Sequence, residues 1–182
     1  WERGEKMEAV RQIGKALSLS PGDIDLSLEG GEMYLKLGLL DDAERLADEA
    51  IASAPRSSEA WQLRGQVNLA RGKPVEALAD FQHSLAFHPD SRDVLRQTAE
   101  VYRQLDRPKR ALATLAILEE TYGPNQVPSD VLALEGLAQE SLGRRADAVE
   151  SYRAAILKGD AEQETVDRLA ALESGDGAVT LR

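Results

Sequence analysis

Small residues recur in this chain at a fixed interval of 34 residues, and this interval constrains the fold more than any other feature. Ala9, Ala43, Ala77 and Ala111 are each 34 residues apart, and Ala148 follows after 37. Repetition at such a period is the signature of architectures in which each unit packs only on its neighbours. The interval therefore predicts an array of similar units rather than an irregular helical bundle.

Four further sets of residues follow the same interval. A second small residue recurs as Gly31, Gly65, Ala99 and Gly136. A turn residue recurs as Gly4, Gly38, Gly72, Asp106 and Gly143. A closing proline recurs as Pro21, Pro55, Pro89 and Pro124. A bulky residue recurs as Ile13, Phe81, Leu115 and Tyr152, with Ala47 as its weak member. Chance alignment of all these sets is very improbable.

The stretch Ser58–Ser91 shows what one unit contains, namely two helices and a tight turn. Gly72 is suited to end the first helix in the left-handed conformation, and Pro74 suits the first turn of the second. Glycine in a helix interior costs about 1 kcal/mol, so the recurring Gly65 indicates a close approach of two helices. Phe81 is expected to fill the space between them.

This stretch resembles a tetratricopeptide repeat, a helix–turn–helix unit of roughly 34 residues with a Trp-Leu-Gly-Tyr, Ala, Phe, Pro pattern. The matching residues are Trp61, Gly65, Ala77, Phe81 and Pro89. Arg64 and Asn68 stand where Leu and Tyr are usual. The resemblance implies an all-α superhelix, or solenoid, of about ten antiparallel helices that binds other proteins and has no catalytic activity.

The repeat register divides the whole chain. The expected segments are the second helix of a truncated repeat (1–23), repeat one (24–57), repeat two (58–91), repeat three (92–125), repeat four after a Gly/Pro insertion (129–162), a capping helix (163–173) and a flexible tail (174–182). Because the register begins within a repeat and the first residue is Trp1, we expect a fragment or processed form of a longer chain.

Details of several helices follow from the same register. The truncated repeat is expected to be helical over Glu2–Leu17, and Asp23 and Ser129 are expected to be N-caps. The capping helix should turn its apolar residues inward and its charged residues to solvent. The inward set is Val166, Leu169 and Leu172, and the outward set is Glu164, Asp167 and Arg168.

Composition narrows the class of function. The net charge of −10 argues against general nucleic-acid binding and against binding to anionic membranes, because both need a basic surface. No apolar run is long enough to span a membrane. Cysteine is absent, which excludes disulfides and thiol chemistry but leaves both a cytoplasmic and an exported location open.

The sequence predicts no catalytic, cofactor or metal site. His83 and His88 are five residues apart and do not share a helix face, and no third ligand lies near them. No serine or threonine has a recognisable partner base. Carboxylate pairs such as Asp41-Asp42 are more typical of solvated helix faces and first turns than of general acids.

In tetratricopeptide proteins the first helices of successive repeats line a concave groove, and the resemblance carries this role to matching positions here. The expected groove residues are Leu28, Glu32, Leu35, Gln62, Gln66, Leu69, Arg96, Glu100, Arg103, Leu137 and Glu140, with Asp25, Glu59, Asp93, Asp130 and Ala133 on the same face. The acids of the first helical turn are also favoured by the helix dipole alone.

Chaperone-binding members of the family hold a partner's terminal carboxylate in a clamp of Lys, Asn and Arg. The matching positions here are Leu28, Glu32, Leu63, Asp93 and Gln97, none of which is basic. We therefore expect no carboxylate clamp in this chain.

Three readings of function remain open: a scaffold that binds a peptide segment or helix in the groove, an assembly module that docks through its ends, and a regulatory or targeting arm of a larger enzyme. The first predicts a partner with apolar anchors and net positive charge. The second predicts a weak homodimer through the N-terminal helix, whose apolar strip comprises Met7, Val10, Ile13 and Leu17.

Overall fold

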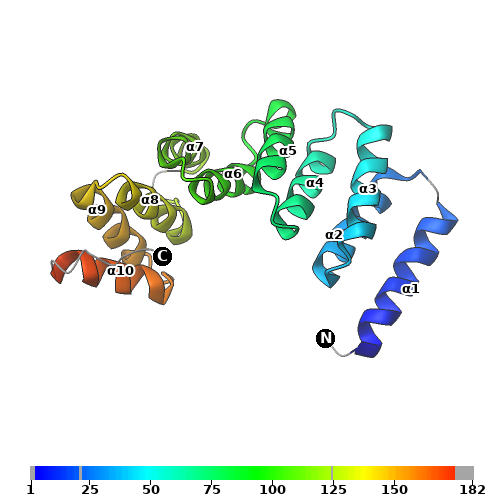
Figure 1. Ribbon diagram of the computed structural model, residues 1–182, viewed down its shortest axis with the longest axis horizontal. Coiled ribbons are helices and arrows are strands. Elements are labelled where there is room, and N and C mark those ends of the chain that lie inside the picture. The colour runs from blue at the N-terminus through cyan, green and yellow to red at the C-terminus, as the bar shows by residue number, and fades with distance from the viewer. Residues whose placement is uncertain (1–2, 21, 124, 175–182) are drawn as a thin grey trace. The chain divides into compact units, whose positions relative to one another are not determined.

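The computed structural model describes residues 3–20, 22–123 and 125–174, and this part of the chain contains ten helices and no strand (Figure 1). It forms two compact units, Trp1–Val94 and Leu95–Arg182, here called the N-terminal and C-terminal units. The helices of the N-terminal unit are α1 (Arg3–Leu19), α2 (Ile24–Leu37), α3 (Leu40–Ser53), α4 (Ser58–Ala70) and α5 (Pro74–Phe87). The unit boundary falls inside α6 (Arg92–Gln104). The helices that follow are α7 (Pro108–Glu120), α8 (Ser129–Ser141), α9 (Arg145–Leu157) and α10 (Gln163–Ser174).

Short turns with a left-handed residue join the two helices of each pair. Gly38, Gly72 and Gly143 have φ of 77°, 70° and 71°, and Asp106 takes the same conformation at φ 53°. Pro74 and Pro108 begin the helices after two of these turns, as predicted. The prediction that Gly4 is a turn residue is wrong, because Gly4 lies inside α1.

The recurring small residues mark close helix contacts, as the sequence predicted. A Cβ atom added at Gly65 would lie 2.5 Å from the Phe81 ring, and one added at Gly136 would lie 2.5 Å from the Tyr152 ring. Both rings are fully buried. At Gly31 the space above the glycine is filled by the side chain of Leu63.

A polar contact stands where the family pattern predicts apolar packing between α4 and α5. Asp80 is only 4% exposed and receives hydrogen bonds from Arg64 at 2.7 Å and from Asn68 at 2.8 Å. These two are the residues that depart from the usual Leu and Tyr. Their buried partner Asp80 explains why the two departures occur together.

In the repeat of α8 and α9, the positions that correspond to Arg64, Asn68 and Asp80 also carry polar residues in contact, namely Glu135, Gln139 and Ser151. The Ser151 hydroxyl lies 2.9 Å from Glu135 and 2.8 Å from Gln139. The corresponding residues of the first repeat are Gly30, Tyr34 and Leu46, of which Tyr34 and Leu46 belong to an apolar cluster. One set of positions therefore carries polar contacts in some repeats and apolar packing in another.

The strip of α1 that was expected to be uncovered is mostly packed. Val10, Ile13 and Leu17 lie against the buried cluster around Tyr34 and Leu46. Met7 is the member of that strip that remains exposed, at 62%. The helix is also longer than predicted, because it continues to Leu19.

Of the two predicted N-caps, Asp23 is confirmed and Ser129 is wrong. Asp23 is the N-cap of α2, and its side chain accepts a hydrogen bond from the Leu26 amide at 3.1 Å. Ser129 is the first residue of α8 rather than its cap, because Pro128 precedes the helix in an extended conformation. Pro21, Pro124 and residues 175–182, most of the expected tail, lie outside the described residues.

Candidate functional site

The predicted groove residues on α2 and α4 of the N-terminal unit differ in exposure, because the acids are exposed and the others are only partly open to solvent. Leu28, Gln62, Gln66 and Leu69 are half-buried. Leu35 packs against the buried cluster around Tyr34, so part of its surface belongs to the core.

Two acids of these helices, Glu32 in the middle of α2 and Glu59 in the first turn of α4, have ordinary local partners. Glu32 is exposed and lies 3.8 Å from Lys36 of the same helix. Hydrogen bonding to its own backbone amide holds the pKa of Glu59 below its usual value, and the Ser57 hydroxyl adds to this effect. These contacts give Glu32 and Glu59 local roles at the surface of α2 and α4.

The C-terminal unit contains a larger hollow of about 800 Å³ between the helices that carry the remaining groove residues. Its walls come from four helices, and the lining residues include Arg103 of α6, Leu137 and Glu140 of α8, Arg145 of α9, and Glu164, Asp167, Arg168, Ala171 and Leu172 of α10. Three residues predicted from two repeats, Arg103 of repeat three and Leu137 and Glu140 of repeat four, therefore line one cavity.

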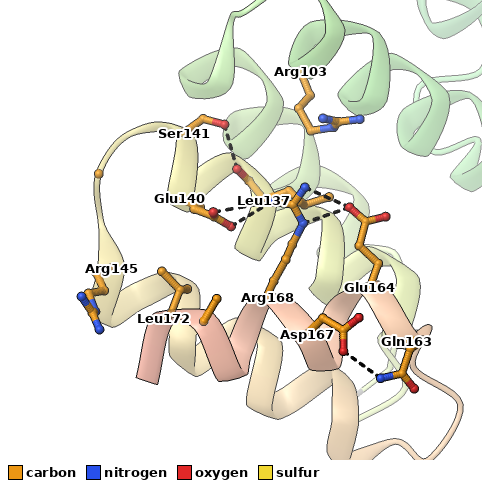
Figure 2. Close-up of a pocket in the computed structure, with 12 residues that line it drawn as sticks. Arg103, Leu137, Glu140, Ser141, Arg145, Gln163, Glu164, Asp167, Arg168 and Leu172 are labelled. Carbon is orange, nitrogen blue, oxygen red and sulfur yellow. Dashed lines mark hydrogen bonds and ion pairs between the residues drawn. The ribbon is translucent and has the colours of Figure 1, made fainter. Parts of the chain in front are cut away.

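Arg168 holds the centre of the larger hollow. Its guanidinium lies between Glu140 and Glu164, as Figure 2 shows, and the side chain is only 27% exposed. Arg168 donates to Glu164 at 2.9 Å and to the two Glu140 oxygens at 3.4 and 3.3 Å. Burial alone would lower the pKa of Arg168, but the bond to Glu164 and the charge of Glu140 raise it overall, so this guanidinium stays charged.

Tyr152 holds the Glu140 carboxylate in position through a hydrogen bond. The buried phenol donates a hydrogen bond to Glu140 Oε2 at 2.8 Å. Burial and this hydrogen bond raise the pKa of Tyr152 well above its usual range, so the phenol remains a donor. The ring that carries this donor is the one that packs on Gly136, so the repeat core positions the carboxylate.

A smaller hollow of about 390 Å³ adjoins the first, and the two share Leu137, Glu164 and Arg168. Arg96, Glu100, Asp130 and Ala133 of the predicted set line it, together with Asp160 and Glu162. Arg103 binds Glu100 through two bonds of 2.6 and 3.0 Å. That hydrogen bonding raises the pKa of Arg103. Arg96 lies 3.8 Å from Asp130.

Helix α10 turns different residues inward from those that the sequence predicted. Arg168 was expected to point to solvent, but it is mostly covered and lines both hollows together with Glu164. Val166 was expected to face inward, but it is 39% exposed, and Thr165 is buried instead. Leu169 and Leu172 do pack inward, against Tyr152 and Ala148.

A signal in the sequence could have revealed this orientation. The first helix of each repeat begins at Ile24, Ser58, Arg92 or Ser129, and α10 begins at Gln163, again 34 residues after the last. Helix α10 therefore has the register of a first helix, and its Glu164 extends the series of first-turn acids that includes Asp130. The prediction that α10 is a solvated cap therefore left out Glu164 and Arg168, which line both hollows.

The described residues show no arrangement typical of a metal centre. They contain no group of three or more metal-ligating side chains. His83 stacks on Trp61 with the ring centroids 4.3 Å apart, and His88 lies 3.2 Å from Asp90. None of the described helices is both long and apolar enough to cross a membrane.

Repeated helix pairs with small residues at their contacts define the fold as an all-α helical repeat superhelix. Residues 28–92 match the family model for the tetratricopeptide repeat. The chain is 28% identical over 125 residues to tetratricopeptide repeat protein 33 of Mus musculus, an alignment that covers 68% of this chain and 48% of that protein. It thus spans about half the length of this relative.

Solved structures share the fold. A crystal structure of MamA superimposes with a TM-score of 0.75 at 23% identity, covering 87% of this chain and 91% of that one. The crystal structure of YrrB, described as a TPR protein with an unusual peptide-binding site, gives a TM-score of 0.68 at 19% identity over 84% of this chain and 77% of that one. The match of residues 28–92 and the shared fold support a tetratricopeptide repeat protein, and proteins with this fold are in general scaffolds for protein–protein interaction.

Proposed function

We propose that the two hollows of the C-terminal unit bind a partner segment that carries both basic and apolar side chains. The observation that carries this proposal is the charge of their lining. The lining of the two hollows contains four arginines and seven carboxylates, and the carboxylates are Glu100, Asp130, Glu140, Asp160, Glu162, Glu164 and Asp167. A surface with this excess attracts a cationic segment and repels an anionic one.

Apolar side chains between these charges supply the second half of the proposed recognition. Leu137 lines both hollows, with Ala133 in the smaller one and Ala171 and Leu172 in the larger. A pocket with an apolar base and a few placed polar groups is the usual form of a binding site. The segment therefore needs an apolar anchor beside its cation.

The proposed activity is binding alone. Glu100 is bound to an arginine and Glu140 to an arginine and a tyrosine, which suits recognition rather than proton transfer at these two carboxylates. Docking through the ends of the array and service as an arm of a larger enzyme stay predictions. In the predicted apolar strip of α1, Met7 is the side chain that stays exposed and could support the weak homodimer, and sedimentation over a concentration series would test it.

A charge-reversal pair tests the proposal. The probe is a 12-residue peptide of alternating leucine, alanine and arginine, compared with the same peptide carrying glutamate in place of arginine. The test variant is Glu162→Lys with Asp167→Lys, two exposed residues of the hollows. The control is Glu120→Lys with Glu150→Lys, two exposed residues of α7 and α9 outside both hollows that change the net charge equally.

The basic peptide should bind the wild type, bind more weakly as salt rises, and lose affinity in the test variant but much less in the control. Calorimetric titration measures each Kd. Equal losses in the two variants would show that overall charge and not the hollows attracts the peptide. Binding of the acidic peptide alone would reverse the proposed partner chemistry.

A further inference from the structure

We infer that Glu140 is the anchoring carboxylate for an arginine of the partner, and that Arg168 occupies that arginine's place in the free protein. This inference rests on the proposed function and goes beyond it, because it assigns one residue as the determinant of specificity and another as an internal competitor. It follows from the different ways in which the carboxylates of the larger hollow are paired.

Glu140 is the carboxylate whose position the repeat core fixes. Tyr152 Oη donates to Oε2 at 2.8 Å, and the Tyr152 ring is fully buried against Gly136. The Glu140 side chain is 33% exposed and lines the larger hollow. A charged acceptor that is held in place before binding loses little conformational freedom when a ligand arrives.

Of the two ion-paired carboxylates of the larger hollow, Glu140 and Glu164, Glu140 also has the longer contact with Arg168. Arg168 Nη1 approaches its oxygens only to 3.3 and 3.4 Å, whereas Arg168 reaches Glu164 at 2.9 Å. In the neighbouring pair, Arg103 reaches Glu100 at 2.6 Å. Charge-assisted bonds of full strength are usually 2.7–2.9 Å long, so a guest cation can replace the Glu140 contact more easily than the Glu164 or Glu100 contact.

Arg168 can leave Glu140 without becoming unpaired. It contacts Glu164 through Nε and Nη2 and Glu140 through Nη1. When a guest guanidinium takes Glu140, the Glu164 contact of Arg168 persists. The exchange therefore replaces one weak ion pair by a stronger one and leaves no charge without a partner.

The geometry favours arginine over lysine as the guest. Glu140 Oε2 already accepts from Tyr152, and Oε1 is free of that bond. The planar guanidinium presents parallel donors to a fixed carboxylate, while an ammonium acts as a point charge. Leu137 lies one helical turn before Glu140 and offers an apolar surface for the stem of an arginine or an adjacent leucine.

The test uses the basic peptide reduced to a single central arginine and the same peptide with citrulline, its uncharged counterpart. Three variants of the full chain are compared with the wild type: Glu140→Gln, which keeps an acceptor for Tyr152, Arg168→Gln, and the control Glu150→Gln, an exposed residue outside both hollows. Circular dichroism checks that each variant keeps its helices.

The wild type should prefer arginine to citrulline roughly fivefold, the effect expected of one half-exposed ion pair. Glu140→Gln should abolish that preference, Arg168→Gln should increase it, and Glu150→Gln should leave it unchanged. A purely structural role for Arg168 would instead weaken binding of both peptides equally.

The outcomes separate this inference from the proposed function. If both peptides bind the hollow but Glu140→Gln keeps the arginine preference, the inference is wrong and the proposed function stands. If Arg168→Gln lowers the preference, Arg168 is not a competitor and the inference is wrong in that part. If neither peptide binds the wild type, the proposed function fails and the inference fails with it.

Discussion

Four glycines in helix interiors provide a graded test of the packing, because an added methyl group meets a different environment at each. At Gly14 of α1 no atom outside its immediate chain neighbourhood lies within 4 Å of an added Cβ. At Gly31 the added atom meets the end of the Leu63 side chain at 2.5 Å. At Gly65 and Gly136 it meets the rings of Phe81 and Tyr152, also at 2.5 Å.

The expected free-energy changes follow from two opposing effects. Replacing glycine by alanine in a helix stabilises by about 1 kcal/mol, because alanine has the higher helix propensity. Overpacking a well-filled core costs about 1–3 kcal/mol. Gly14→Ala should therefore stabilise by up to about 1 kcal/mol, and Gly31→Ala should be close to neutral because a leucine end can rotate.

The two glycines beneath aromatic rings should behave differently. Two ring atoms of Phe81 lie within 2.7 Å of the Cβ position at Gly65, and the buried ring cannot rotate away as a leucine end can. Gly65→Ala should therefore destabilise the N-terminal unit by up to about 2 kcal/mol net. Gly136→Ala should do the same to the C-terminal unit, with the added effect of displacing Tyr152 from Glu140.

Urea denaturation followed by circular dichroism and by the fluorescence of Trp61, which lies in α4, measures these effects. Gly14→Ala is the matched control, since it makes the same chemical change in open space. The order of stability should be Gly14→Ala, then Gly31→Ala, then Gly65→Ala. A Gly65→Ala protein as stable as the Gly14→Ala protein would refute the argument that close contact with Phe81 requires glycine.

Two further predictions concern buried polar groups. Asp80→Ala should cost about 1–3 kcal/mol, because Arg64 and Asn68 lose their shared acceptor, and adding Arg64→Leu and Asn68→Leu should recover much of it in the same urea assay. Burial, and secondly the charge of Glu135, raises the pKa of Glu119, so this carboxyl destabilises the folded state increasingly as pH rises from its ordinary pKa through the raised one. The gain from Glu119→Gln should accordingly grow between about pH 4 and pH 7, while the adjacent exposed Glu120→Gln should show no such growth, and equal pH profiles for the two variants would contradict the assignment.

The sequence by itself determined the repeat and its helices. The 34-residue interval predicted where helices pair and turn, because the turn conformation at Gly72 and the contact at Gly65 each demand a particular kind of residue. Such demands are local to one helix pair. They can be read from residue type and spacing without knowing the rest of the molecule.

The same local reasoning missed what depends on partners distant in sequence. Arg64 and Asn68 looked like imperfections of the repeat until the structure placed both on Asp80 of the next helix. Polar residues at a buried position are stable only as a set, and residue type alone does not reveal the set.

The candidate site was decided at the tertiary level. The register placed Leu137 and Glu140 on one helix face, but only the structure showed that Tyr152 holds Glu140 and that Arg168 comes from α10 to meet it. The sequence of one helix does not show whether a charged side chain is covered by other helices or open to solvent. Arg168 was therefore expected to face solvent. The packing of α10 in the register of a further first helix turned that arginine into the hollow, because Leu169 and Leu172 must cover the core around Tyr152.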